Sequence, residues 1–187
     1  MKKIILASAS PRRKELLETA DVPFEICVAD VDESIPEGTL PADAAKLTAS
    51  KKAAAVSQLY PEAVVIGADT IVVADGRILG KPKNEDDAKN MLRSLSGKEH
   101  LVITGVCISC GENQTVFEKT SKVRFYELTD SEIESYVATK ECMDKAGSYG
   151  IQGKGCVLVE SIDGDYFNIV GLPVAATVRE LKKLNAL

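Results

Sequence analysis

Residues 63–70 read AVVIGADT, an unbroken run of apolar and small side chains that ends on a carboxylate and a hydroxyl. Such a run is typical of a strand that is covered on both faces of a sheet. Asp69 stands where this strand is expected to reach its carboxyl end, which is where α/β sheets bind ligands. A carboxylate placed there must be paired or metal-bound. A structural turn or cap aspartate is the alternative.

The flanking segments alternate between strand and helix patterns in the first half of the chain, and hairpin patterns cluster in the second half. We expect strands at residues 3–7, 24–29, 63–67, 70–74, 101–110, 114–126, 156–162 and 166–170, with a hairpin turn at 75–76. We expect helices at residues 11–20, 41–60, 84–95 (capped by Asn84) and 172–184, and another opening at the capping box of residues 129–132. This mixture predicts an α/β fold with a long, twisted mixed sheet flanked by helices. No repeat or linker divides the sequence, so residues 1–187 are expected to form a single domain.

The composition excludes several classes of partner. The 187 residues carry 23 Lys and Arg against 28 Asp and Glu, a formal net charge of −5. Proteins that coat nucleic acids or bind anionic membranes need an excess of positive charge. No apolar run approaches the roughly 18 residues that span a bilayer, and the apolar stretch 4–7 is too short for a signal peptide. We therefore expect a cytoplasmic protein with no membrane and no nucleic-acid partner.

The cysteines and the single histidine limit the metal chemistry. Five cysteines, an odd number, are scattered along the chain, as is typical of reduced cytosolic thiols. Cys107 and Cys110 form a C-x-x-C motif, but on a strand their side chains would point to opposite faces, which disfavours a shared zinc ion. Because His100 is the only histidine, a hydrolase built on this chain is expected to use a carboxylate as its general base, with Asp69 as the candidate.

Residues 8–13 (SASPRR) follow the first expected strand and open the first expected helix. The first turn of a helix normally favours acidic side chains, yet Arg12 and Arg13 lie there. A phosphate chain would bind well where these two guanidinium groups converge with the hydroxyls of Ser8 and Ser10 and with free backbone N–H groups. Two solvated arginines are the alternative.

Two further lysines and an acidic loop extend the phosphate hypothesis. Lys81 stands between glycine and proline in a rigid turn that can aim its side chain. Lys52 lies among small residues of the alanine-rich helix, whereas its neighbour Lys51 is expected to be solvated. Glu33 lies in the acidic loop 30–38, and carboxylates beside a phosphate site indicate Mg²⁺, which combines a few protein oxygens with substrate phosphate oxygens. Surface lysines and a solvated loop are the alternatives.

The glycine-rich stretch of residues 144–155 contains YGIQG at 149–153, which offers one amide and one aromatic ring. The amide of Gln152 can both donate and accept hydrogen bonds. It can therefore read the edge of a nucleobase.

Together, seven blocks of sequence resemble the Maf family of nucleoside triphosphate pyrophosphatases, in its dTTP/UTP branch. The blocks are SASPRR (8–13), GADT (67–70), LGKP (79–82), LSG (95–97), DKAGSYGIQG (144–153), GDY (164–166) and GLP (171–173). Each block is weak alone, but seven in order across nearly the whole chain make a specific signal. The sequence departs from the family at Cys142, where proline is usual, and this difference lies outside the expected chemistry.

The resemblance implies an elongated fold similar to that of inosine triphosphate pyrophosphatases, with two lobes around a central cleft. It implies hydrolysis between the α- and β-phosphates, which yields a nucleoside monophosphate and pyrophosphate. It also implies a divalent cation, Mg²⁺ or Mn²⁺, and a homodimer. On the family pattern the catalytic proton acceptor is Asp69, and the metal ligands are Glu33 and Asp69. The resemblance assigns phosphate binding to Ser8, Arg12, Arg13, Lys52 and Lys81. It assigns substrate specificity to Arg12, Thr70 and Gln152.

Two other functions stay open at this point. One is a non-catalytic protein that binds nucleotides or partners and regulates septum formation, a process to which Maf proteins have been linked. The joint presence of Glu33, Asp69 and Lys81 favours catalysis, because a pure binder needs no base. The other is a house-cleaning pyrophosphatase for purine or modified nucleotides, which Thr70 and Gln152 disfavour.

Overall fold

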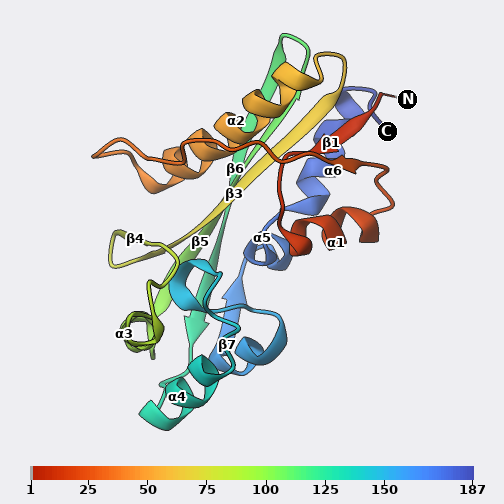
Figure 1. The fold of residues 1–187 in the computed structure, drawn as a ribbon. Helices are drawn as coiled ribbons and strands as arrows, with labels where there is room; N and C mark the ends of the chain where they lie inside the picture. The colour runs from red at the N-terminus through yellow and green to blue at the C-terminus, as the bar shows by residue number, and fades with distance from the viewer. Residues whose placement is uncertain (1) are drawn as a thin grey trace. The chain divides into compact units, whose positions relative to one another are not determined.

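A computed structural model describes residues 2–187 as a mixed α/β fold with a seven-stranded sheet (Figure 1). The strands are β1 (Ile4–Leu6), β2 (Glu25–Ile26), β3 (Val64–Ala74), β4 (Arg77–Leu79), β5 (Glu99–Cys110), β6 (Asn113–Phe125) and β7 (Val159–Asp163). They lie in the order β2-β1-β3-β5-β6-β7, and β4 pairs with β3. Strand β1 is parallel to β2 and β3, whereas β3–β4 and β6–β7 are antiparallel. The predicted mixed sheet is confirmed.

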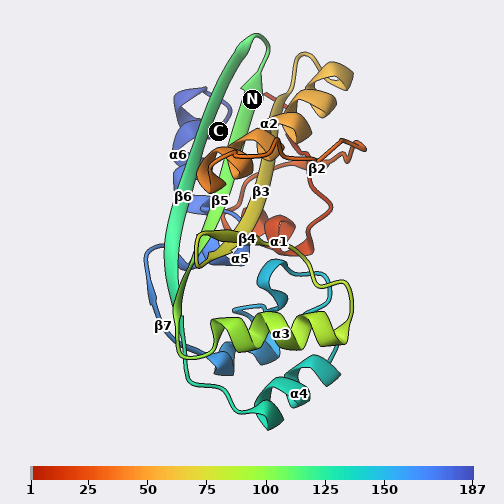
Figure 2. The same cartoon turned by 90° about the vertical axis from the view of Figure 1, so that its left-hand side faces the viewer.

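Within residues 2–187, six α-helices and two short 3₁₀ helices accompany this sheet (Figure 2). They are α1 (Pro11–Thr19), α2 (Pro41–Leu59), α3 (Glu85–Leu95), α4 (Asp130–Ala138), η1 (Ala146–Ser148), η2 (Gly153–Leu158), α5 (Tyr166–Val170) and α6 (Val174–Lys183). No helix within residues 2–187 has the length and apolar character needed to cross a bilayer.

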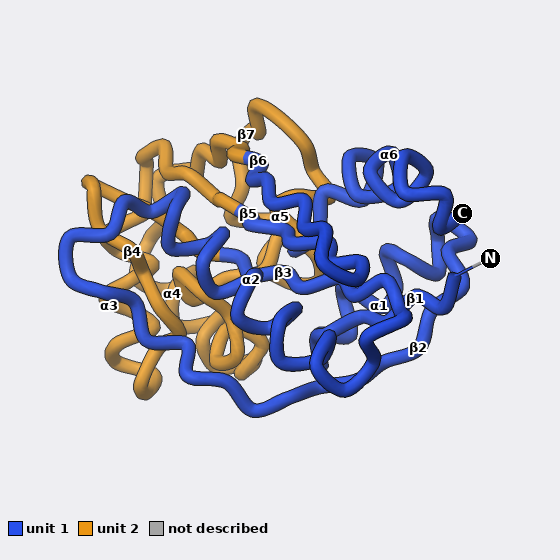
Figure 3. The backbone as a smooth tube through the Cα atoms, turned by 90° about the horizontal axis from the view of Figure 1, so that it is seen from above, with its two compact units in different colours: residues 1–70, 104–119, 171–187 blue, residues 71–103, 120–170 orange. Residues whose placement is uncertain are grey.

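The chain divides into two compact units (Figure 3). Unit 1 comprises residues up to 70, 104–119 and 171–187, and unit 2 comprises residues 71–103 and 120–170. Strands β3, β5 and β6 each contribute residues to both units. The number of units equals the number of lobes that the resemblance implies. The elongated shape, the central cleft and the single-domain boundaries stay predictions.

In unit 1, helix α2 packs directly on the sheet at two glycines. A Cβ atom on Gly67 would lie 2.2 Å from the backbone oxygen of Ala49. A Cβ atom on Gly105 would lie 2.4 Å from the backbone oxygen of Ala45. Any side chain at either position would force helix and sheet apart, so both strands need glycine where α2 crosses them.

In unit 2, three buried rings form part of the core. The ring of Tyr149 lies edge-on to that of Phe125, with centroids 4.7 Å apart, and to that of His100, at 5.3 Å. The Tyr149 hydroxyl is also hydrogen-bonded to Nε2 of His100 at 2.8 Å. The interpretation of Tyr149 as a ring offered to a ligand is therefore wrong, because its packing and its hydroxyl are both used in the core.

Three local signals position elements as predicted. The side chain of Asn84 accepts a hydrogen bond from the backbone N–H of Asp87 at 2.9 Å and caps α3. Thr129 and Glu132 form the capping box that opens α4. Residues 75–76 join β3 to β4 as a hairpin, with φ of 50° and 75° in the left-handed region that such a turn requires.

Three strand predictions in the first half of the chain need correction. The expected strand 24–29 shrinks to β2, a pair of exposed residues at the edge of the sheet. The expected strands 63–67 and 70–74 form one strand, β3, so Asp69 lies inside a strand and not at its carboxyl end. The parallel neighbour β1 ends at Leu6, opposite Ile66. Asp69 therefore lies beyond the end of β1 while β3 itself continues.

The expected strand 156–162 begins as the 3₁₀ helix η2 and becomes the strand β7 only at Val159. The carboxylate of Glu141 accepts hydrogen bonds from the backbone N–H groups of Lys154 at 3.1 Å and Gly155 at 3.4 Å. These bonds satisfy the start of η2 without a sheet partner.

The expected strand 166–170 is the helix α5. The carboxylate of Asp165 accepts a hydrogen bond from the backbone N–H of Phe167 at 2.8 Å, and its backbone oxygen accepts one from Ile169 at 3.4 Å. This local capping outweighs the strand propensity of the aromatic and branched side chains in the segment.

Candidate active site

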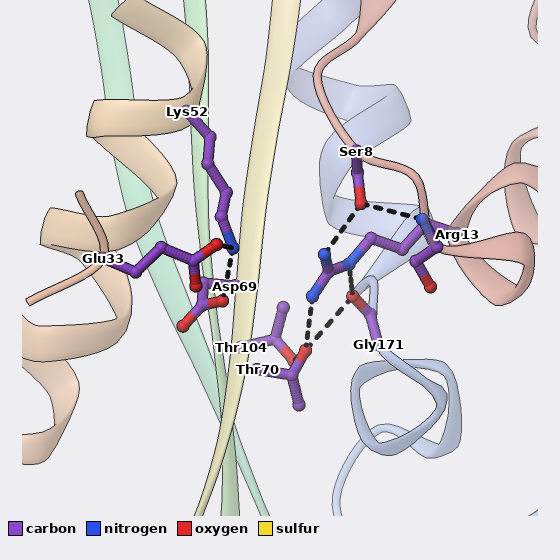
Figure 4. Close-up of polar contacts among 9 residues, drawn as sticks. Ser8, Arg13, Glu33, Lys52, Asp69, Thr70, Thr104 and Gly171 are labelled. Carbon is purple, nitrogen blue, oxygen red and sulfur yellow. Dashed lines mark hydrogen bonds and ion pairs between the residues drawn. The ribbon is translucent and has the colours of Figure 1, made fainter. Parts of the chain in front are cut away.

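Lys52 lies between two acidic side chains of unit 1 (Figure 4). Its Nζ is 2.8 Å from Oδ1 of Asp69 and 3.2 Å from Oε1 of Glu33. Lys52 and Asp69 expose only 15% and 17% of their side chains, whereas Glu33 exposes 57%. Charge-assisted bonds of this length are strong, and burial reduces their screening by salt. The structure thus brings together three predicted site residues, which we call the Lys52 cluster.

The neighbouring Lys51 positions the loop that carries Glu33. Its Nζ donates to the backbone oxygens of Asp32 at 3.0 Å and Ser34 at 2.9 Å, on either side of Glu33. The Asp32 carboxylate accepts bonds from the N–H and the hydroxyl of Ser34, which lower the pKa of Asp32. Lys51 thus lies at the surface, as predicted, but its two bonds to the loop backbone were not predicted. Of the two neighbouring lysines of helix α2, Lys51 bonds the backbone of this loop, and Lys52 pairs with the carboxylate of Glu33.

Arg13 is the centre of a second cluster in unit 1, the Arg13 cluster. Its guanidinium donates to Oγ of Ser8 at 3.0 Å and to Oγ1 of Thr70 at 3.1 Å. It also donates to the backbone oxygen of Gly171 at 2.8 Å. Oγ1 of Thr70 is in turn 2.9 Å from Oγ1 of Thr104. With 8% of its surface exposed, Arg13 joins segments that lie far apart in the sequence.

The charges of both clusters act on Arg13. Burial lowers the pKa of Arg13, and the charge of Asp69 opposes this effect. Arg12, the half-buried second residue of α1, lowers the pKa of Arg13 further, and Glu33 raises it. The guanidinium stays charged, because the pKa of arginine begins far above neutral pH. The two clusters therefore share one electrostatic environment.

Strand β3 runs between the clusters. Asp69 and Thr70 are consecutive residues of this strand, so their side chains point to opposite faces. Figure 4 shows the Lys52 cluster on one side of the strand and the Arg13 cluster on the other. Three residues predicted to bind phosphate therefore have partners within the protein: Ser8 and Arg13 are bonded to each other, and Lys52 is bonded to two carboxylates. The phosphate-binding roles of these residues stay predictions.

The remaining predicted residues, Lys81 and Gln152, belong to unit 2. Lys81 is exposed shortly after β4, and Gln152 is half-buried directly before η2. The backbone N–H of Gly147 donates to the oxygen of Gly80 at 3.1 Å, which ties the turn of Lys81 to the loop that leads to Gln152. Gly147 has a φ of 69°, and a Cβ atom on it would lie 2.9 Å from Cγ1 of Val72. Only glycine fits there.

Three members of these arrangements were not predicted: Lys51, Thr104 and Gly171. Thr104 is a fully buried hydroxyl inside the otherwise apolar run 101–108 of β5, and a polar residue inside such a run was the available signal. Gly171 bonds Arg13 through its backbone oxygen, and a backbone contact cannot be predicted from a side-chain pattern. Its GLP block does belong to the family resemblance.

Glu33 and Asp69 fit the chemistry of the implied divalent cation. Both offer carboxylate oxygens, the donors that Mg²⁺ prefers, and both lie within 3.2 Å of the same nitrogen. They are therefore close enough to share one cation. Within residues 2–187, no group of three or more His, Cys, Asp or Glu side chains is placed to hold a metal ion. A cation at this pair would take its other ligands from water and phosphate, as Mg²⁺ commonly does.

Comparisons with known proteins identify the family. The family described as Maf-like protein matches residues 3–184. A relative from Bacillus cytotoxicus named dTTP/UTP pyrophosphatase is 55% identical over 186 residues, which cover 100% of this chain and 97% of the relative. A relative from Bacillus mycoides with the same name is 57% identical over the same coverage. The solved structure of the Staphylococcus aureus Ham1 protein matches 66% of this chain and 72% of its own, with a TM-score of 0.48 and 16% identity. The chain belongs to the Maf family.

Proposed function

We propose that this Maf protein hydrolyses dTTP and UTP to the nucleoside monophosphate and pyrophosphate. Its family and its identity of 55–57% to full-length relatives named dTTP/UTP pyrophosphatase make it a nucleoside triphosphate diphosphatase. The observation that carries the proposed mechanism is the Lys52 cluster. It unites a carboxylate base, a second carboxylate and an ammonium group in unit 1.

In this mechanism Asp69 accepts the proton of the water that attacks the α-phosphate. Pairing with Lys52 requires the carboxylate form of Asp69, and this form is the proton acceptor. The bond between the α-phosphorus and the bridging oxygen breaks, and pyrophosphate leaves. Positioning and charge neutralisation supply most of the remaining rate, because phosphoryl transfer needs little covalent chemistry from the protein.

Four cationic side chains and one hydroxyl hold the triphosphate in the proposed complex. The residues assigned to this task are Ser8, Arg12, Arg13, Lys52 and Lys81. A divalent cation held by Glu33 and Asp69 would, when bound, neutralise phosphate charge and orient the leaving group. Because Arg13 is buried and bonded to Ser8 and Thr70, its position supports a part in shaping this site as well as in neutralising charge.

Base selection is assigned to Arg12, Thr70 and Gln152. The hydroxyl of Thr70 is held by Arg13, and Gln152 carries an amide that can donate and accept. A cytoplasmic homodimer is part of the same proposal. The homodimer rests on the family resemblance alone, and the cytoplasmic location rests on the composition of the sequence.

Pyrophosphate release by the purified protein with Mg²⁺ tests the function across dTTP, UTP, CTP, dATP, GTP, ITP and 7-methyl-GTP. We expect turnover only with dTTP, UTP and close pyrimidine relatives. Asp69→Asn is expected to lower turnover about 100-fold or more, since a positioned general base contributes roughly 10²–10⁴. The matched control is Asp75→Asn, which removes an exposed carboxylate in the β3–β4 turn and is expected to keep full turnover.

Each result decides a different part of the proposal. Preference for a purine would contradict the assigned specificity and leave the reaction intact. An Asp69→Asn variant that keeps more than about a tenth of the activity, a barrier change under roughly 1.4 kcal/mol, would remove Asp69 as the base. A folded protein that binds dTTP without turnover would favour the non-catalytic regulator.

A further inference from the structure

The ammonium group of Lys52 holds the same two carboxylates that are assigned to the divalent cation. The bond to Asp69 is short, and both of its partners are mostly buried. A hard cation needs the lone pairs of these carboxylate oxygens. Lys52 therefore competes with any divalent cation for Asp69 and Glu33.

The charges involved link this competition to the substrate. Glu33 and Asp69 carry one more negative charge than Lys52 neutralises. This charge opposes the attraction that Arg12 and Arg13 exert on an anionic triphosphate. With a divalent cation bound, the two carboxylates are neutralised without Lys52. The ammonium group is then a positive charge available to phosphate oxygens.

We propose that Lys52 is an exchangeable counter-ion. It neutralises Asp69 and Glu33 in the substrate-free protein, and it moves to the phosphate chain when a divalent cation takes over these carboxylates. The movement of Lys52 to the phosphate chain rests on the proposed function. Lysine suits the task because its ammonium is a compact charge with three donors on a flexible stem. Cation and nucleotide then bind cooperatively, because each favours the position of Lys52 that the other needs.

The surroundings of Lys52 allow its side chain to move while the rest of the site stays in place. Helix α2 is fixed on the sheet by its close contact with Gly67. Lys51 holds the loop of Glu33 independently, through two backbone oxygens. Glu33 therefore keeps its place when Lys52 leaves.

Mn²⁺ titration calorimetry of the nucleotide-free protein tests the exchange. Lys52→Met removes the competing ammonium, and Mn²⁺ is expected to bind about fivefold more tightly or better, as for the loss of a half-buried ion pair. The matched control is Lys46→Met, which removes the same charge from the same helix, where Lys46 pairs with Asp43 and Glu118. It is expected to change the Mn²⁺ affinity less than about twofold. Lys51→Met is expected to weaken Mn²⁺ binding, because the loop of Glu33 loses its anchor.

Three results overturn the exchange. They are an unchanged or weaker Mn²⁺ affinity of Lys52→Met, an equal gain in Lys46→Met, and no measurable Mn²⁺ binding by either wild type or Lys52→Met. Because Lys52→Met leaves two carboxylates without their counter-ion, a measurement on wild type stands beside it. The side-chain ¹⁵Nζ NMR signal of Lys52 is expected to shift when Mg²⁺ is added, while that of Lys46 stays. A Lys52 signal that does not move also overturns the exchange.

A non-hydrolysable dTTP analogue separates this proposal from the proposed function. Lys52→Met is expected to bind the analogue with Mg²⁺ about tenfold more weakly, the loss of one charge-assisted contact, which is opposite in sign to its gain for Mn²⁺. If wild type hydrolyses dTTP but the Mn²⁺ and NMR results fail, the function stands and the exchange is wrong. If the Mn²⁺ and NMR results hold but wild type neither binds nor hydrolyses dTTP, the counter-ion role stands and the assigned substrate is wrong.

Discussion

At the scale of single residues, Arg13 shows why a charged side chain can be buried. Its guanidinium bonds Ser8, Thr70 and Gly171. Arginine presents its donors in a rigid planar fork, whereas lysine has one ammonium group on a flexible stem. Nε, Nη1 and Nη2 of Arg13 each donate to a different acceptor, and the single nitrogen of a lysine cannot occupy all three positions. A hydrogen bond from a charged donor contributes about 1.5–3 kcal/mol.

We therefore expect Arg13→Lys to lower the free energy of unfolding by about 2–4 kcal/mol, since it loses one or more of the buried hydrogen bonds that the guanidinium donates. Urea denaturation measures this change. The matched control is Arg179→Lys, an exposed arginine of α6 in the same unit, which is expected to stay within about 0.5 kcal/mol of wild type. Equal stabilities of the two variants would mean that the guanidinium geometry of Arg13 does not support the fold.

At the scale of elements, the position of α2 sets the position of the Lys52 cluster, because Lys52 belongs to this helix. Gly105 of β5 lets α2 approach so closely that an added Cβ would lie 2.4 Å from Ala45 backbone atoms. Gly105→Ala is expected to lower the free energy of unfolding by about 2–4 kcal/mol, as overpacking against backbone does. It is also expected to reduce turnover, since α2 carries Lys52 away from Asp69.

Gly80→Ala is the control for this variant. A Cβ atom on Gly80 meets nothing within 4 Å, so thermal unfolding of Gly80→Ala is expected to match that of wild type. If Gly105→Ala unfolds at the wild-type temperature as well, α2 adjusts freely and does not fix Lys52.

The elements also show which parts of the fold were predictable. Signals that depend on near neighbours, such as the Asn84 cap and the Thr129 capping box, predicted helices that the structure has. The start of η2 was missed because it depends on Glu141, which lies outside the segment itself. Helix α5 was missed although its cap, Asp165, is local. In the same way, the residues that carry charge could be named from the sequence. Their partners could not, because Arg13 and Gly171 are 158 positions apart.

At the scale of the whole molecule, stability depends on pH through the buried His100. Burial lowers the pKa of His100 to about 4, whereas a histidine in the unfolded chain titrates near pH 6.5. Between these values the unfolded chain binds a proton that the folded protein does not. The contribution of His100 to the free energy of unfolding is therefore fully present above pH 6.5 and is lost as the pH drops toward 4.

The surroundings of His100 explain why the folded protein rejects this proton. Nε2 of His100 is bonded to the hydroxyl of Tyr149, and burial raises the pKa of Tyr149, so this hydroxyl stays protonated. Nδ1 has no hydrogen-bond partner among residues 2–187. Protonation of His100 would thus place a charge in an aromatic core with no acceptor for its second N–H, which is costly.

We expect the free energy of unfolding of wild type to fall between pH 7 and pH 4 by up to about 3 kcal/mol more than that of His100→Gln. Glutamine keeps an amide that can bond Tyr149 and does not titrate. Urea denaturation of both proteins at pH 7, 5.5 and 4.5 measures the difference, and all other titrating groups are common to both. The difference must grow as the pH falls. A constant offset at all three values would mean that His100 titrates in the folded protein as it does in the unfolded chain, and that its burial does not govern the response to acid.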